Sequence, residues 1–215
     1  MKNNPTPDFK YDETYFANHF ASPFYRRYVG LRNKFIHQEL MRFAQIGKFL
    51  EIGFGDENLI KLFNKDFEVF GLDISEFAVR EITRNYRSDH FTICDISKEK
   101  IPFNDGFDVI GAINTVEHLS DPEFALKNIY TSLETGGIFL VYMPTQSNLL
   151  SRFKYRQFYD VKEHIFRPSV RSLRDLLTRL GFRLVKEYAG SLIPLKISNL
   201  SLLQSLNLYF GLWMK

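Results

Sequence analysis

The sequence has almost no cysteine and no long apolar run. Cys94 is the only cysteine, which excludes a disulfide framework and a cysteine-based zinc site and is typical of a reducing compartment. No window reaches 18 apolar residues, so we expect no transmembrane span. The first residues, MKNNPTPDFKYDE, lack the apolar core of a signal peptide, and we therefore expect a cytoplasmic protein.

Blocks of like charge are also absent. The net charge is +3 and charged residues make up 25% of the 215 residues, so composition alone indicates neither disorder nor nucleic-acid binding. A hydrophobic content of 45% is enough for a real core. We expect one α/β domain over residues 47–215, preceded by an N-terminal helical cap over residues 1–46.

Strand-like and helix-like segments alternate from about Lys48 to Tyr188, which predicts βαβ units and a parallel sheet. Asp121 and Ser169 are expected to cap two later helices. Residues 8–46 are predicted to be largely helical and aromatic, which would let them cover a ligand site. The expected strands are Phe49 to Ile52, Glu68 to Leu72, Phe91 to Cys94, Phe107 to Ile113, Ile138 to Met143 and Phe182 to Tyr188.

The stretch FLEIGFGDENLIKLF looks like a nucleotide-binding turn with acids after its glycines. Gly53 and Gly55 follow the first strand, at the sheet edge where open α/β folds bind ligands, and glycine lets the backbone approach closely. Asp56 can cap a helix expected to begin at Glu57. A pyrophosphate would need positive potential there, whereas Glu51, Asp56 and Glu57 favour a ligand with an ammonium and a sulfonium. S-adenosylmethionine is such a ligand.

Two further acids end the next two expected strands. Asp73 lies 20 residues after Gly53, where a carboxylate can accept both hydroxyl hydrogens of an adenosine ribose. Asp95 can accept from the adenine amino group, with Ile74 and Ile96 in apolar contact with the ring. Each acid alone could merely cap the next helix. Their occurrence at consecutive strand ends favours the ligand.

Together, the segments FLEIGFGDENLI, VFGLDISEFAV, FTICDISKEKIPFNDGFDVIGAINTVEHLSDP and LETGGIFLVYMP resemble the class I S-adenosylmethionine-dependent methyltransferases, the broad family of small-molecule type methyltransferase domains. The resemblance covers about residues 45–190. It implies an α/β fold: a Rossmann-like, mostly parallel seven-stranded sheet with helices on both faces and the last strand antiparallel.

The same resemblance assigns roles to single residues. It implies that Glu51, Gly53 and Gly55 form the first motif, that Asp73 binds the ribose and Asp95 the adenine, and that the backbone of Asn114 faces the methionine part of the cofactor. One residue departs from the family pattern, because Glu57 stands where many members carry a third glycine.

Methyl transfer is a displacement in which the cofactor supplies the reactivity and the protein supplies alignment. His118, in NTVEHLSDP after the fourth strand, is the first candidate for a general base, and His164, in KEHIFRP, is the second. Glu117 and His118 could instead only fix this loop. With Asn114 they resemble, imperfectly, the metal-holding acids of some quinone-pathway O-methyltransferases. Asparagine in place of an acid weakens a hard-cation site, so we expect no metal.

The segment 145–168 is long for a connection and predicts a substrate lid. Its mixture of basic and aromatic residues suits RNA, an anionic small molecule or a solvated amphipathic helix. Near the N-terminus, Tyr25, Arg26 and Arg27 could meet a carboxylate or phosphate, or only pack the lid. The apolar tail, Leu192 to Trp213, fits a last hairpin strand, a dimer face or a contact for a lipid-like substrate. The basic and aromatic residues of the lid are Arg152, Phe153, Lys154, Tyr155, Arg156, Phe158, Tyr159 and Lys162.

We therefore expect a methyltransferase that modifies an O or N nucleophile of a small molecule, either anionic or apolar, in a chain that could form a homodimer. The alternatives are a non-catalytic adenosine-cofactor-binding partner subunit, an RNA methyltransferase and a nicotinamide dehydrogenase. The dehydrogenase is disfavoured because its third glycine would fall at Asn58.

Overall fold

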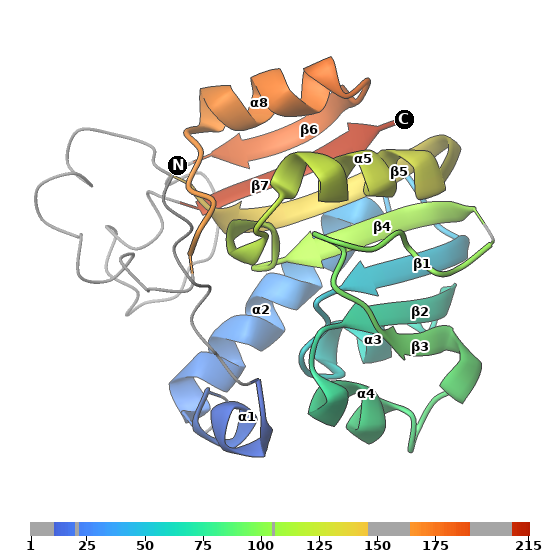
Figure 1. The fold of residues 1–215 in the computed structure, drawn as a ribbon, viewed down its shortest axis with the longest axis vertical. Coiled ribbons are helices and arrows are strands. Elements are labelled where there is room, and N and C mark those ends of the chain that lie inside the picture. Colours follow the sequence, from blue (N-terminus) through green and yellow to red (C-terminus); the bar gives the residue numbers. More distant parts are fainter. Residues whose placement is uncertain (1–10, 20–21, 105, 146–163, 190–207) are drawn as a thin grey trace, which may run out of the picture.

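The computed structural model describes residues 11–19, 22–104, 106–145, 164–189 and 208–215. Seven strands form one sheet in the order β3-β2-β1-β4-β5-β7-β6 (Figure 1). β7 is antiparallel to both its neighbours, and the remaining pairs are parallel. The expected fold class is confirmed. The strands are β1 Gly47–Ile52, β2 Phe67–Asp73, β3 Phe91–Ile93, β4 Phe107–Ile113, β5 Leu133–Pro144, β6 Arg183–Ala189 and β7 Leu208–Met214.

Two strand boundaries differ from the sequence prediction in an informative way. β5 begins at Leu133 rather than Ile138, because Leu133 already pairs with Phe107 before an irregularity in the β4–β5 register. β3 ends at Ile93, so Asp95 lies two residues beyond the strand rather than at its end. A turn rather than a strand therefore sets the direction of the Asp95 side chain.

Successive residues within a strand alternate between two hydrophobic cores, as is expected when a sheet is covered on both faces. Phe49 packs with α2, α3 and α4, whereas Leu50 packs on the other face with α5 and α8 (Figure 1). Each fully buried side chain of this size contributes about 1.5–3 kcal/mol. The helices are α1 Glu13–His19, α2 Pro23–Leu40, α3 Asn58–Phe63, α4 Glu76–Ile82, α5 Pro122–Ser132 and α8 Val170–Arg179, with 3-10 turns η1 Ser88–His90 and η2 Val116–His118.

Side-chain caps set several helix starts. The expected caps are confirmed, because Asp121 accepts from the amide of Phe124 at 3.0 Å and Ser169 from that of Ser172 at 3.1 Å. The third helix begins at Asn58 rather than Glu57, and the Asp56 carboxylate accepts the Asn58 amide at 3.1 Å.

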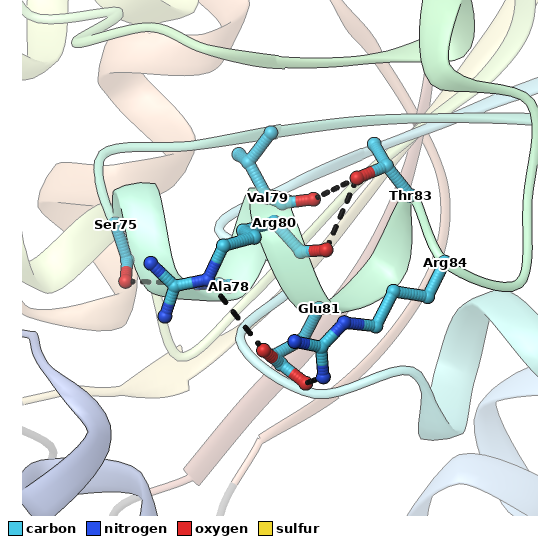
Figure 2. Close-up of polar contacts among 7 residues, drawn as sticks. All are labelled: Ser75, Ala78, Val79, Arg80, Glu81, Thr83 and Arg84. Atoms are coloured by element: carbon cyan, nitrogen blue, oxygen red, sulfur yellow. Dashed lines mark hydrogen bonds and ion pairs between the residues drawn. The ribbon is translucent and has the colours of Figure 1, made fainter.

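The helix α4 follows β2 directly and is fixed at both ends by its own side chains (Figure 2). Ser75 Oγ accepts from the amide of Ala78 at 3.1 Å, and Thr83 Oγ1 donates to two carbonyls of the last turn. Arg84 pairs with Glu81 on the exposed side (Figure 2). Ser75 Oγ also donates to the carbonyl of Tyr11 at 2.5 Å, which ties the N-terminal segment to the end of β2.

Parts of the predicted additions lie outside the described residues. These include the interleaved basic and aromatic residues of the predicted lid, and most of the apolar tail. The end of that tail forms β7, where Tyr209 and Trp213 are buried, so the prediction of a last strand is right for this part. Over the residues described here, no helix has the length and hydropathy to cross a membrane.

Candidate functional site

A cavity of about 570 Å³ lies at the carboxyl ends of the parallel strands. It lies where β1 is flanked by β2 and β4, the point at which the strand order reverses, and open α/β sheets bind ligands there. All ten residues proposed from the sequence line this one cavity, namely Glu51, Gly53, Gly55, Asp73, Ile74, Asp95, Ile96, Asn114, His118 and His164.

The loop after β1 depends on glycine. Gly53 and Gly55 have φ values of +69° and +54°, which L side chains rarely adopt. A Cβ on Gly53 would lie 2.5 Å from Oγ1 of Thr115, whose hydroxyl donates to the carbonyl of Ile52 at 3.0 Å. The end of β1 therefore packs against the turn after β4 too closely for a side chain at position 53.

Asp73 is 7% exposed, and each of its carboxylate oxygens accepts a hydrogen bond from a backbone amide. Gly55 N donates to Oδ2 at 2.9 Å and Ser75 N to Oδ1 at 2.8 Å. Burial raises the pKa of this carboxyl, and the bonds from these amides oppose that rise. Because a carboxylate oxygen has two lone pairs, Asp73 can still accept two hydrogen bonds from a ligand.

Asp95 holds the turn after β3. Its oxygens accept from the Ser97 amide at 3.0 Å and pair with Lys98 Nζ at 2.7 Å. Ile96 beside it is buried, whereas Ile74 lies on the cavity with 53% of its surface exposed. An apolar ring bound between them would cover Ile74.

Glu51 is 3% exposed, and its Oε2 has no hydrogen-bond partner among the described residues. Burial raises its pKa well above the usual 4.5, the charges of Asp56 and Asp73 add to the rise, and that of Arg32 opposes it. A cationic ligand group would stabilise the ionised form. Glu57, by contrast, does not line the cavity and accepts from Asn85 Nδ2 at 3.5 Å.

The helices α1 and α2, with Tyr11 just before α1, form an aromatic wall with one cation. Arg32 is 8% exposed, donates through Nε to Asn33 Oδ1 at 3.0 Å, and places its Cζ 5.6 Å from the centroid of the Tyr142 ring. Among the described residues that line the cavity, it is the only arginine or lysine. The aromatic residues of this wall are Tyr11, Tyr15, Phe16, Tyr25 and Tyr28.

The arginine of α2 that lines the cavity is Arg32, which was not among the residues considered from the sequence. Arg26 and Arg27 are exposed and do not line the described cavity. Tyr25 does line it, and Arg32 follows seven residues later, about two helical turns on. Positions 25, 28, 29, 32 and 33 all line the cavity, and this helical spacing was the signal that could have identified Arg32.

Glu117, His118 and His164 meet at one end of the cavity. The carbonyl of Glu117 accepts from the amides of Ile165 and Phe166 at 2.8 and 2.9 Å. The rings of His118 and His164 have centroids 4.9 Å apart and are inclined at 71°. One metal-ligating atom of each of these three residues lies within 4.8 Å of the other two.

Glu117 is the most buried member of this group. It is 1% exposed, its Oε2 has no partner among the described residues, and burial raises its pKa to about 8. Asn114, which the sequence analysis grouped with Glu117 and His118, has a positive φ of 51°, and its amide donates to the carbonyl of Tyr142 at 2.7 Å. A non-glycine residue in this conformation is strained, and such strain is frequent at functional sites.

The sheet order and the position of the cavity define an open α/β protein of the Rossmann-like class. The sequence of residues 24–187 matches the family model described as a methyltransferase domain, and the chain belongs to this family. The resemblance to class I S-adenosylmethionine-dependent methyltransferases is thus confirmed. Among curated proteins, no significant sequence match is found.

Solved structures share this fold at low sequence identity. A SAM-dependent methyltransferase from Archaeoglobus fulgidus is 18% identical, with 95% of this chain and 100% of that chain covered and a TM-score of 0.71. A SAM-dependent methyltransferase from Thermotoga maritima, described as a possible histamine N-methyltransferase, is 20% identical, with coverages of 94% and 98% and a TM-score of 0.66.

A third similar chain, from Haloferax volcanii, was solved in complex with a methyltransferase activator. It is 14% identical, with 93% of this chain and 96% of that chain covered and a TM-score of 0.66. Identities this low establish the common fold only.

Proposed function

We propose that this protein binds S-adenosylmethionine and transfers its methyl group to an O or N nucleophile of a small molecule. The observation that carries the proposal is the order of polar groups along the sheet edge. Asp95 follows β3, Asp73 ends β2 and Glu51 is the second-last residue of β1, and these three strands are adjacent in the sheet. This order matches adenine, ribose and the methionine ammonium along one extended cofactor, with Asn114, the residue after β4, proposed to lie beside the methionine end.

The charge of the cavity supports the same cofactor. Five described carboxyl groups line it against one guanidinium: Glu51, Asp56, Asp73, Asp95 and Glu117 against Arg32. Such a lining favours a ligand with a sulfonium and an ammonium and disfavours the pyrophosphate of a nicotinamide cofactor. No described carboxylate lies within ion-pair distance of Arg32, and its Nη groups are suited to the methionine carboxylate of the cofactor.

The proposed reaction is a single displacement. The acceptor oxygen or nitrogen attacks the methyl carbon, the S–C bond breaks with its electron pair going to sulfur, and the acceptor loses a proton. His118 and His164 both line the cavity, and either imidazole can take that proton. Alignment of the two reactants can contribute roughly 7–11 kcal/mol. A cavity of about 570 Å³ lies within the range of small-molecule sites.

Calorimetry with S-adenosylhomocysteine and with NAD tests the cofactor assignment directly. We expect binding of S-adenosylhomocysteine and no comparable binding of NAD, and the reverse ranking would refute the proposal. Transfer of a radiolabelled methyl group to a panel of hydroxyl and amine acceptors then separates an enzyme from a non-catalytic partner subunit. A cytoplasmic location and a homodimer stay predictions of the sequence.

A further inference from the structure

We propose that Glu117, His118 and His164 form a binding site for one divalent transition-metal ion at the acceptor end of the cavity. This inference rests on the proposed function, because the ion would act on the acceptor of the same methyl transfer. It departs from the sequence-based expectation of no metal, which considered only Asn114, Glu117 and His118.

The backbone already holds the three side chains together. Glu117 and His118 belong to η2, and the amide of His118 donates to the carbonyl of Thr115 at 3.0 Å. His164 directly precedes Ile165, whose amide donates to the Glu117 carbonyl. A backbone hydrogen bond thus joins two segments that are 48 residues apart in the sequence, directly beside the proposed ligands.

The distances require only side-chain adjustment. The three ligand atoms lie within 4.8 Å of one another. Protein ligands bind such an ion at about 2.0–2.2 Å, which places neighbouring ligand atoms about 3–3.5 Å apart. Closing the remaining gap of about 1–2 Å is within the reach of side-chain rotations of Glu117 and of the two partly exposed imidazoles.

The environment of Glu117 is an independent reason to expect a cation. Its carboxyl is almost fully buried, and one oxygen has no partner among the described residues. Ionising a buried carboxyl that has an unpartnered oxygen is costly, and a coordinated cation removes that cost. Arg32 acts on Glu117 only through its charge and forms no ion pair with it within the described residues.

The donor set indicates the kind of ion. Two imidazoles and one carboxylate suit zinc, cobalt, iron or manganese better than magnesium or calcium, which prefer oxygen ligands. The asparagine at position 114 therefore does not weigh against this site, since the third ligand is His164. Three protein ligands leave positions open for a substrate oxygen.

An open coordination position would define the acceptor class. A hydroxyl bound to the cation loses its proton to solvent more easily, and the resulting oxyanion attacks the methyl carbon while the S–C electrons pass to sulfur. With the cation bound, His118 and His164 are ligands and neither takes the proton. This arrangement favours an oxygen acceptor, such as a phenol, over an amine.

Cobalt provides a probe that does not depend on activity. We would strip the full-length protein with a chelator, titrate Co²⁺, and follow both heat and visible absorption. For the wild type we expect one Co²⁺ site per chain, with visible d–d absorption bands of an ion bound by nitrogen and oxygen ligands. His164→Asn and Glu117→Gln should each weaken Co²⁺ binding at least about tenfold. His37→Asn is the matched control, because His37 pairs with Asp66 and lies outside the cavity lining.

Each outcome decides the inference. No Co²⁺ site in the wild type overturns it, and so does a loss of affinity in His37→Asn as large as that in His164→Asn. His164→Asn is the primary variant because this histidine is partly exposed, whereas Glu117 is in the core and its variant must first be checked for folding. S-adenosylhomocysteine binding is measured in parallel. If it persists when Co²⁺ binding is absent, the metal inference fails while the proposed function stands.

Discussion

The amide of Gly55 donates to Oδ2 of Asp73 at 2.9 Å, which joins the loop after β1 to the last residue of β2. The other oxygen of Asp73 accepts from the amide of Ser75, the N-cap of α4. One carboxylate therefore sets the shape of the glycine loop and retains lone pairs toward the cavity. Loop geometry and the proposed ribose contact depend on the same side chain.

Asp73→Ala should weaken S-adenosylhomocysteine binding by about 1.5–3 kcal/mol, or about 10–150-fold, because charge-assisted bonds to the ribose hydroxyls are lost. Calorimetry measures the affinity. Asp73→Asn keeps the side-chain shape but sets its NH2 group against one of the two backbone amides whose hydrogen bonds Asp73 accepts, so it should not restore the affinity. Unchanged affinity in a folded alanine variant would place Asp73 outside the cofactor site.

Gly53→Ala should lower the free energy of unfolding by at least about 2 kcal/mol, because its φ of +69° is strained for alanine and the new Cβ would meet Thr115. Gly30→Ala is the control. Gly30 lies inside α2, and an alanine Cβ there would meet no atom within 4 Å, so alanine should raise stability by about 0.5–1 kcal/mol. Urea denaturation measures both changes, and equal effects would contradict the predicted close packing.

Glu51→Gln should stabilise the cofactor-free protein increasingly as the pH rises above about 4.5. The folded pKa of Glu51 is raised, so between the unfolded and folded values the native state binds more protons and wild-type stability falls with pH. The glutamine variant lacks this loss, which amounts to about 1.4 kcal/mol per pH unit across the window. Denaturation midpoints at several pH values measure the difference. If the stabilities of the two proteins changed with pH in parallel, the pKa of Glu51 in the folded protein would not be raised.

Arg32→Met should weaken S-adenosylhomocysteine about 10–150-fold while changing the affinity for methylthioadenosine less than about twofold. Methylthioadenosine lacks the carboxylate proposed to bind Arg32, and a hydrogen bond to a charged group contributes about 1.5–3 kcal/mol. Lys34→Met removes an exposed cation from the same helix and should change neither affinity. Equal losses for both ligands in Arg32→Met would indicate a structural role for Arg32.

Reversing the charges of Arg152, Lys154 and Arg156, which lie outside the described residues, should alter acceptor turnover and leave S-adenosylhomocysteine affinity nearly unchanged. We also expect negligible binding to a mixed RNA pool at low salt. RNA binding that falls steeply with salt and disappears in the triple variant would instead favour an RNA methyltransferase.

The sheet and the residues proposed to bind the cofactor could be predicted to lie together because their signals are local. Apolar runs mark the strands: Gly53 directly follows β1, Asp73 is the last residue of β2, and Asp95 lies two residues beyond β3. In a parallel sheet the carboxyl ends of the strands meet at one edge, so residues at those positions come together once the topology is known. Their order along the edge matches the order of the strands, and no long-range contact had to be guessed.

Tertiary structure decided the positions of Arg32 and His164 in the cavity lining. Arg32 points into the cavity because of the rotation of α2 about its axis, which depends on how residues such as Ile36 and Leu40 pack on the sheet. His164 lies beside His118 because the amides of Ile165 and Phe166 bind the Glu117 carbonyl. These contacts span 48 and 49 residues, and no local pattern encodes them. The sequence by itself determined the fold, the family and the strand-end residues. Long-range packing decided that Arg32 lines the cavity, and backbone hydrogen bonds decided that His164 lies beside His118.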